Sequence, residues 1–258
     1  MPDWGLGRYE LTAAELEPVA RWVVAMAAPL RDERVLDIAC GTGNAAILAG
    51  RFKSKVIGLD QARRLIEVAG QRAAAEGLDI RFVVGNAEEL GFPDESFEVA
   101  LSIFGLIFAS DPQRAFAEMV RVMTPRGRAF FTVWMPGGAI DSFVNVCMKY
   151  VHAAAGQSAP PPRFAWHDEA VVQDLASRHR ATVRFHEGEL QFLDDSPEDF
   201  LRRNQQNHPM SVATRPLLEE AGSLEAMEKE SLAALRAGNE DPHKFRVTSR
   251  YRVVEVRR

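Results

Sequence analysis

The chain has 258 residues, of which 47% are hydrophobic and 26% charged, a composition typical of a folded globular protein. Its formal net charge is −5 and no strongly basic stretch stands out, which weighs against a nucleic-acid partner. No apolar run reaches the roughly 18 residues of a membrane span, and residues 1–10 lack the pattern of a signal peptide. We therefore expect one α/β domain without membrane or nucleic-acid partners, whose oligomeric state the sequence does not determine.

The two cysteines, Cys40 and Cys147, are far apart in the chain and do not have the close spacing of metal ligands. Free thiols without a disulfide framework are typical of a reducing compartment. We therefore predict a cytoplasmic protein that holds no metal.

The N-terminal part combines an irregular stretch with a helix. Residues 1–10 contain a proline, two glycines and two large aromatic residues, Trp4 and Tyr9. Apolar side chains then recur at helical spacing over residues 11–30. The pattern predicts a helix there, which covers apolar surface ahead of the first strand.

A strand, a turn of small residues and a helix follow one another over residues 35–38, 39–43 and 44–51. This succession is a common nucleotide cradle, because the helix N-terminus and the turn present backbone N–H groups to a ligand. Gly41 and Gly43 let the backbone approach that ligand where a Cβ atom would clash. The segment therefore predicts a cofactor loop.

Asp37 distinguishes two classes of ligand for this loop. A carboxylate at the end of the strand repels a pyrophosphate but suits a cationic amine. The dinucleotide pattern G-x-G-x-x-G is also incomplete, because no glycine stands three residues after Gly43. The loop thus favours a cofactor that carries an amine, and an NAD(P)-binding oxidoreductase is the alternative.

Further strands are expected over residues 55–60, 80–84, 98–104 and 128–134. They are continuous apolar runs separated by helices over residues 62–76 and 111–123, which indicates a buried parallel sheet. The first ends in Asp60, whose carboxylate can accept both ribose hydroxyls of an adenosine. In open α/β sheets ligands bind at the carboxyl ends of the strands, so Asp37, Asp60, Asn86 and Ser102 should converge there.

The second half of the chain is less regular. Helices are expected over residues 140–155 and 168–178, a Gly/Ser/Pro linker over 156–162, and strands over 181–193 and 245–256. A polar helical stretch with a break at His208-Pro209 separates the last two strands. It is far longer than a connection requires. We therefore predict a helical cap, formed by residues of about 136–165 and 196–240.

The ordered motifs resemble one enzyme family. The blocks VLDIACGTGN, VIGLD, VVGNAEELGFPDESFEVALSIFGLIF and RVMTPRGRAFFTVW are similar to those of the class I S-adenosylmethionine (SAM) methyltransferases. Within that class they are most similar to the branch of ubiquinone/menaquinone-type and small-molecule methyltransferases, over residues 35–134. Two positions depart from the family pattern. Ala39 replaces the first loop glycine, and Asn86 replaces an aspartate. Asn86 can still accept a hydrogen bond from an adenine amino group.

The resemblance implies a three-layer, Rossmann-like α/β fold. Its seven-stranded sheet would be mostly parallel, with strand 7 antiparallel between strands 5 and 6. It also implies one domain over residues 1–258, whose N-terminal residues, about 1–30, fold over the cofactor as a lid. Tyr9 would belong to that lid.

The resemblance also implies roles for individual residues toward SAM. Asp37 would lie near the methionine amine, Asp60 at the ribose and Gln61 at the edge of the adenine, while Asn86 and Ala87 would hydrogen-bond the adenine. The predicted cofactor-binding set is Tyr9, Asp37, Ala39, Gly41, Gly43, Asn44, Asp60, Gln61, Asn86, Ala87, Ser102 and Phe104.

The favoured function is transfer of a methyl group from SAM to a small, apolar or aromatic metabolite, at O, N or C, by in-line displacement. An apolar pocket for that acceptor is expected to be lined by Phe108, Trp134, Phe143 and Trp166. His167 and His208 fall in or next to the predicted cap, where one of them could remove the acceptor proton, and His167 is the candidate general base. Besides the oxidoreductase, a non-catalytic SAM-binding regulator is a second alternative to the methyltransferase. The sequence does not identify the acceptor.

Overall fold

The structure, a computed structural model, describes residues 3–157 and 164–258. Its strands are β1 (Arg34–Ile38), β2 (Lys55–Asp60), β3 (Arg81–Val84), β4 (Phe97–Ser102), β5 (Met123–Trp134), β6 (Thr182–Asp194) and β7 (Phe245–Arg257). Its helices are α1 (Tyr9–Ala27), α2 (Asn44–Gly50), α3 (Arg63–Ala75), η1 (Leu106–Phe108), α4 (Pro112–Val122), α5 (Gly138–Ala154), α6 (Glu169–Arg178), α7 (Pro197–Asn207), α8 (Pro209–Glu220) and α9 (Leu224–Ala237).

Within the described residues, seven strands form one sheet in the order β3-β2-β1-β4-β5-β7-β6. The pairs β1–β2, β1–β4, β2–β3 and β4–β5 are parallel. β7 runs antiparallel to both β5 and β6. This arrangement confirms the predicted sheet, including the antiparallel strand between its fifth and sixth members.

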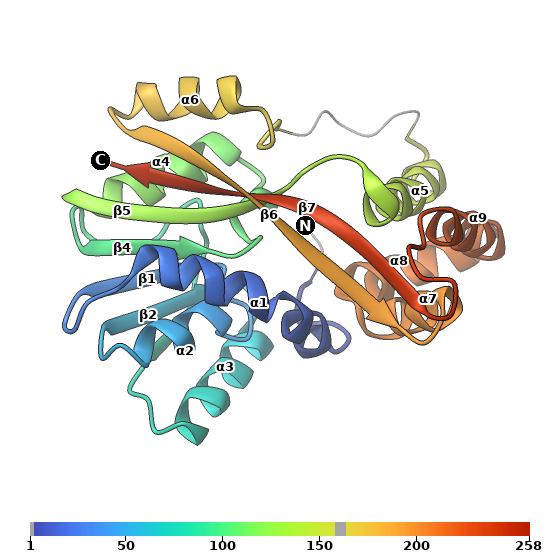
Figure 1. Cartoon of the computed structure of the whole chain (residues 1–258), viewed down its shortest axis with the longest axis horizontal. Coiled ribbons are helices and arrows are strands. Elements are labelled where there is room, and N and C mark those ends of the chain that lie inside the picture. Colours follow the sequence, from blue (N-terminus) through green and yellow to red (C-terminus); the bar gives the residue numbers. More distant parts are fainter. Residues whose placement is uncertain (1–2, 158–163) are drawn as a thin grey trace.

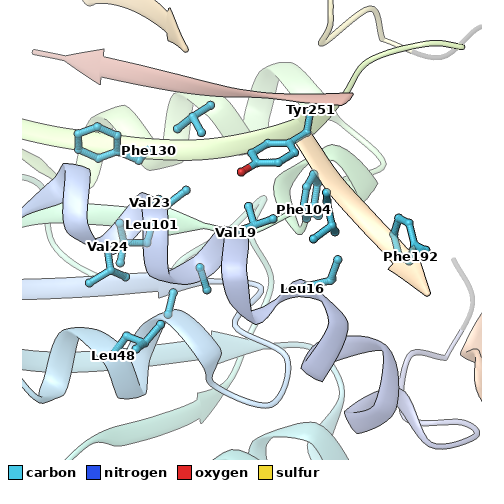
Figure 2. Close-up of a cluster of buried hydrophobic side chains, with 14 of the residues drawn as sticks. Leu16, Val19, Val23, Val24, Leu48, Leu101, Phe104, Phe130, Phe192 and Tyr251 are labelled. Carbon is cyan, nitrogen blue, oxygen red and sulfur yellow. The ribbon is translucent and has the colours of Figure 1, made fainter. Parts of the chain in front are cut away.

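Helices cover both faces of the sheet, which makes three layers (Figure 1). α1 and α2 pack into the apolar core on one face, next to α3, whereas α4 and α6 pack into the core on the other. Figure 2 shows Val23 of α1 beside Leu101 and Val19 beside Phe104, and Val24 belongs to the same buried cluster. The apolar residues spaced along α1 therefore bury one stripe against the strands, as their helical spacing predicts.

The bounds of α1 differ from the prediction. The helix begins at Tyr9 rather than near residue 11, and Pro18 lies inside it. It ends at Ala27 rather than Leu30, because Ala28 adopts a left-handed conformation (φ 42°) and donates its N–H to the Val24 carbonyl. Residues 28–33 are thereby free to turn the chain into β1.

β6 and β7 extend beyond the rest of the sheet. β5 pairs with β7 only between Arg128↔Arg257 and Trp134↔Tyr251, whereas the β6–β7 pairing continues to Asp194↔Phe245. The resulting two-stranded ribbon carries α7, α8 and α9 at its far end, beside α5 (Figure 1). We call these four helices the helical cap; residues 158–163 of the predicted cap lie outside the described residues.

The apolar core continues from the sheet into the helical cap. Leu101 and Phe130 of the sheet belong to the same buried cluster as Phe143 of α5, Phe200 of α7 and Leu235 of α9. Because this cluster is shared, the helical cap is held against the sheet by buried apolar surface rather than by the ribbon alone.

Candidate active site

A pocket of about 600 Å³, including its open mouth, lies at the carboxyl ends of β1, β2, β3 and β4. This volume is within the range of small-molecule sites, roughly 300–1,000 Å³. Its lining residues are Trp4, Tyr9, Ala39, Gly41, Leu59, Asp60, Gln61, Leu65, Gly85, Asn86, Ala87, Ile103, Phe104, Gly105, Phe108 and Ala109. Eight predicted cofactor residues are among them, together with Phe108 of the predicted acceptor set. Asp37, Gly43, Asn44 and Ser102 are not part of this lining.

The two loop glycines are required for different reasons. Both have a left-handed backbone, with φ of 54° at Gly41 and 83° at Gly43. A Cβ atom at Gly41 would come 3.0 Å from the Tyr9 ring, on the pocket side. A Cβ atom at Gly43 would instead come 3.1 Å from Phe82 and 3.2 Å from Ala69, beneath the loop. Gly43 therefore meets a packing requirement, whereas Gly41 lines the pocket itself.

Asp60 joins the end of β2 to the loop. One carboxylate oxygen accepts the Gly41 N–H at 2.9 Å, and the other accepts the Ala62 N–H at 2.9 Å. The side chain is 8% exposed, and burial raises the pKa of its carboxyl against the effect of these hydrogen bonds. The carboxylate is thus fixed in orientation at the pocket wall, where each oxygen retains a lone pair for a ligand.

Asn86 is also oriented by the backbone. Its side-chain oxygen accepts the Glu88 N–H at 3.0 Å, and Asn86 forms an isolated bridge with Glu89. The second lone pair of that oxygen and the amide NH₂ remain able to bind a ligand. Gln61 and Ala87 also line this pocket, so the three residues predicted at the adenine belong to one pocket.

Asp37 lies beneath the loop rather than in the pocket. Its side chain is 1% exposed and accepts the Ala46 N–H of α2 at 2.8 Å. Burial, together with the nearby charge of Asp60, raises the pKa of Asp37 to about 7 against this hydrogen bond. The first role of Asp37 is therefore to brace the loop, and its contact with a methionine amine stays a prediction.

Asp37→Asn should change how stability depends on pH. The folded pKa of about 7 lies above the ordinary 3.8, so the folded chain retains a proton that the unfolded chain has released. Stability from this group is complete below pH about 4 and is lost as the pH rises to about 7. Between pH 5 and 8 the free energy of unfolding of the wild type should fall by roughly 2–3 kcal/mol, whereas that of the variant should not show this fall. Urea unfolding at the two pH values measures this difference. An equal change in the free energy of unfolding between pH 5 and 8 in both proteins would refute the ionisation argument.

Tyr9 and Trp4 cover the pocket from the N-terminal side. The Tyr9 ring lies over Gly41, and Trp4 contacts both Tyr9, at 5.8 Å between ring centroids, and Phe108, at 4.7 Å. Burial, and then the nearby Asp60, raises the pKa of the Tyr9 hydroxyl, which therefore stays protonated. Sequence reasoning gave Trp4 no place in the site, although an aromatic residue in an irregular stretch was a signal for it.

Asn44 and Ser102 act as internal braces in this structure. The Asn44 amide donates to the Ala13 carbonyl of α1 at 2.6 Å and accepts from Arg72 of α3 at 2.8 Å. The buried Ser102 hydroxyl donates to the Ile38 carbonyl at 2.8 Å and accepts the Leu106 N–H at 2.9 Å. Both residues hold the surrounding elements in register without lining the pocket.

Phe104 contributes to the pocket wall while most of its ring lies in the core. Its backbone is left-handed (φ 53°), and its N–H donates to the Thr132 hydroxyl at 2.7 Å. The ring stacks on Trp134 at 3.8 Å and stands edge-on to Tyr251, as Figure 2 shows for Phe104 and Tyr251. Trp134 is therefore a layer behind the pocket rather than part of its lining.

Phe143 lines a separate cavity of about 520 Å³, including its open mouth, within the helical cap. Apolar side chains of α5, α7, α8 and α9 surround this cavity, including Met210 and Leu218. It is distinct from the pocket at the strand ends, so the predicted acceptor residues do not form one group.

Trp166 and His167 lie on the side of the sheet that carries α4 and α6. The Trp166 indole is buried against Phe131 and Phe164, in the core that contains α4 and α6. His167 is exposed, and its backbone carbonyl accepts a hydrogen bond from Arg252 at 2.9 Å. Neither residue reaches the pocket, which corrects the prediction of Trp166 as an acceptor contact and of His167 as a base there.

His208, at the break between α7 and α8, is nearer the pocket. Its ring is 6.0 Å from the Trp4 ring, and its Nδ1 atom accepts the Met210 N–H at 3.3 Å. Burial lowers the pKa of His208 to about 4, so the ring is neutral at pH 7 and carries its proton on Nε2. In this state it is a hydrogen-bond donor and a weak base.

The described residues contain neither a membrane-spanning helix nor a cluster of metal ligands. No helix among residues 3–157 and 164–258 is both long and apolar enough to cross a membrane. In the same residues, no group of three or more His, Cys, Asp and Glu side chains is arranged to hold a metal ion.

Comparison with known proteins places the chain among methyltransferases. A family model described as a methyltransferase domain matches residues 36–131. An uncharacterized protein of Mycobacterium tuberculosis is 34% identical over 173 residues, so the match covers 67% of this chain and about three fifths (62%) of that protein. A second protein of that organism, also uncharacterized, is 32% identical over 188 residues, which cover 72% of this chain and 68% of that protein.

The uncharacterized methyltransferase YcgJ of Bacillus subtilis is similar in both sequence and structure. It is 36% identical over 118 residues, which cover 44% of this chain and 46% of YcgJ. Structural alignment with its crystal structure covers 95% of this chain and 98% of YcgJ, with a TM-score of 0.64 at 19% identity. At this identity the structural likeness shows a shared fold.

Proposed function

The chain belongs to the class I SAM-dependent methyltransferases, and from this we propose that it methylates a small, apolar or aromatic metabolite. One observation carries the acceptor class: the pocket that holds the cofactor residues also has an aromatic wall, Trp4 and Phe108, and no Lys or Arg among its lining residues. Such a wall suits an uncharged, flat acceptor and offers no cation for a phosphate or carboxylate group.

The cofactor is SAM, and the residues present fit it. The Gly41 backbone permits a ligand to approach the loop, and the fixed Asp60 carboxylate matches a ribose diol. Asn86 and Ala87 line the same pocket and offer an amide and a backbone N–H to an adenine ring. We propose that these four residues hold the adenosyl group and that Tyr9 closes over it.

When bound, SAM supplies an electrophilic methyl group on a sulfonium. The leaving group of this displacement is neutral, so the protein need not protonate it. The proposed tasks of the chain are to align the acceptor with the methyl group and to exclude water, with Trp4, Tyr9 and Phe108 as the covering surface. His208 would donate its Nε2–H to a polar atom of the acceptor, because its depressed pKa makes it a poor base.

We also propose roles for the N-terminal residues and for the helical cap, as the sequence predicts. Residues of about 1–30 would act as the lid, and the helical cap would enclose the acceptor on the side of His208. Both proposals are supported by the contact between Trp4 and His208, which places the N-terminal segment against the start of α8. The reduced thiols of Cys40 and Cys147 fit a cytoplasmic protein.

The decisive experiment has two stages. Calorimetric titration should show binding of S-adenosylhomocysteine and none of NADH; a preference for NADH would refute the cofactor assignment. Release of S-adenosylhomocysteine from SAM is then measured over a panel of phenols, quinols and aromatic amines, with tRNA, DNA and protein as the other acceptors. Turnover on a macromolecule alone would contradict the acceptor class, and cofactor binding without turnover on any acceptor would favour a regulator.

Phe108→Ala should weaken binding of the acceptor while leaving the affinity for the cofactor unchanged. Phe108 is 43% exposed at the pocket mouth, and its ring meets Trp4, so truncation removes part of the aromatic wall. We expect the acceptor KM to rise about tenfold, which corresponds to about 1.4 kcal/mol, while the Kd of S-adenosylhomocysteine changes less than threefold.

The matched control is Phe52→Ala, because Phe52 is also an exposed phenylalanine (50%) but lies in the turn after α2. Its kinetics should equal those of the wild type. An unchanged acceptor KM in the Phe108 variant would show that the acceptor binds elsewhere.

A further inference from the structure

Arg64, in the first turn of α3, holds the N-terminal segment in place. Its guanidinium donates to the Gly5 carbonyl at 2.6 Å and to the Gly7 carbonyl at 3.2 Å, and it pairs with Glu10 at 2.9 Å. One side chain thus binds two backbone carbonyls and the first turn of α1. Sequence reasoning had assigned Arg64 no role.

A second contact fixes the same segment from the opposite side. The Arg8 N–H donates to the Asn207 carbonyl, at the end of α7, at 2.9 Å. Gly7 has φ of 63°, and a Cβ atom there would come only 2.3 Å from that carbonyl oxygen. The segment of residues 3–8 therefore bridges α3 and the helical cap, with little free space beside Asn207.

The bridged segment forms part of the pocket. Trp4 lines the pocket and contacts Phe108, while its ring also lies 6.0 Å from His208. If the segment swung away, the pocket would lose this aromatic wall and the support of the Tyr9 ring over Gly41. Retention of a ligand in the pocket then depends on what holds residues 3–8 down.

We propose that Arg64 is a positioning residue that latches residues 3–8 over the bound cofactor and so limits the rate at which the cofactor leaves. The proposal rests on the proposed function for the identity of that cofactor. Arg64 stands four residues after Asp60, so the ribose contact and the latch belong to the same β2–α3 corner. A ligand at Asp60 steadies that corner and therefore the latch.

The latch also has a consequence for the acceptor. Trp4 completes the aromatic wall only while residues 3–8 are closed, so loss of the latch would also open the acceptor side of the pocket.

The test compares Arg64→Ala with the neighbouring Arg63→Ala. Arg63 is exposed, and its side chain makes no hydrogen bond or ion pair with any described residue, so it controls for the loss of one positive charge on α3. Stopped-flow displacement gives the dissociation rate constant of S-adenosylhomocysteine. We expect at least a tenfold increase in Arg64→Ala, with an association rate constant within threefold of the wild type and an unchanged melting temperature. Arg63→Ala should behave as wild type.

Two further variants separate a latch from general structural support. Arg64→Lys keeps the charge beside Glu10 but not the planar fork that reaches both carbonyls, so its dissociation rate should lie between those of the wild type and Arg64→Ala. Gly7→Ala disturbs the opposite contact and should also speed dissociation, although Arg64 is intact.

Hydrogen exchange supplies a readout that needs no ligand. Peptides that contain the Arg8 amide should exchange faster in Arg64→Ala than in Arg63→Ala, while peptides of β6 and β7 stay protected. Equal exchange and equal dissociation rates in the two variants would overturn the latch. If the wild type fails to bind S-adenosylhomocysteine, the proposed function fails, and the exchange of the Arg8 amide still decides whether Arg64 holds the segment.

Discussion

Asp60→Ala should weaken the binding of S-adenosylhomocysteine at least a hundredfold. The buried carboxylate would hold the ribose through two charge-assisted hydrogen bonds, each worth about 1.5–3 kcal/mol. Its loss also frees the Gly41 N–H, which holds the loop against the end of β2. Isothermal titration calorimetry measures the Kd, and circular dichroism shows whether the fold is retained.

Two comparisons make the result specific. Asp79→Ala removes an exposed aspartate just ahead of β3 and should leave the Kd unchanged. Asp60→Asn keeps an acceptor for the Gly41 N–H but lacks the charge, so its Kd should lie between those of the wild type and Asp60→Ala. A folded Asp60→Ala protein with a wild-type Kd would mean that the cofactor does not bind at the end of β2.

Trp166→Ala should destabilise the protein by about 3–5 kcal/mol, as for other buried aromatic truncations. Trp166 is 5% exposed and packs against Phe131 and Phe164, on the face of the sheet that carries α4 and α6. Because it does not line the pocket, the Kd of S-adenosylhomocysteine should change less than twofold at temperatures where the variant is folded. Urea unfolding and calorimetry provide the two measurements.

Trp166→Phe is the matched control. The indole Nε1–H is buried without a hydrogen-bond partner in the described part of the chain, so phenylalanine keeps an aromatic ring and removes an unsatisfied donor. Its loss of stability should be much smaller than that of the alanine variant. A stable Trp166→Ala protein with a raised acceptor KM would restore Trp166 to the acceptor site.

The strands and the cofactor loop could be predicted from local pattern. Continuous apolar runs indicate buried parallel strands, and each strand end carries its polar residue to the same edge of the sheet. Asp60 and Asn86 therefore reach the pocket as expected. Asp37 obeys the same rule, yet its side chain turns under the loop to accept the Ala46 N–H, a contact that no strand pattern contains.

The aromatic and histidine residues were harder to place. The four aromatic residues predicted for the acceptor pocket look alike in the sequence, yet they occupy different places. Phe108 lies at the pocket mouth and Trp134 in the layer behind it, whereas Phe143 lines the cavity in the helical cap and Trp166 lies in the core beneath α4 and α6. Apolar character predicts burial but not the cavity beside which a residue is buried. His167 was predicted as a base, but it is exposed and lies outside the pocket lining, because its sequence position does not show toward which surface it turns.

The sequence by itself determined the family, the order of the strands along the chain and the carboxylate expected at the ribose. These depend on short segments, in which spacing, glycine positions and apolar runs constrain the backbone directly. Only the tertiary structure decided that Trp4 covers the pocket, that Arg64 holds residues 3–8 and that His208 stands beside Trp4. The contact between Trp4 and His208 joins residues about two hundred positions apart, because the β6–β7 ribbon carries the helical cap back to the N-terminal segment. Their geometry follows from how the packed layers meet, which no local pattern encodes.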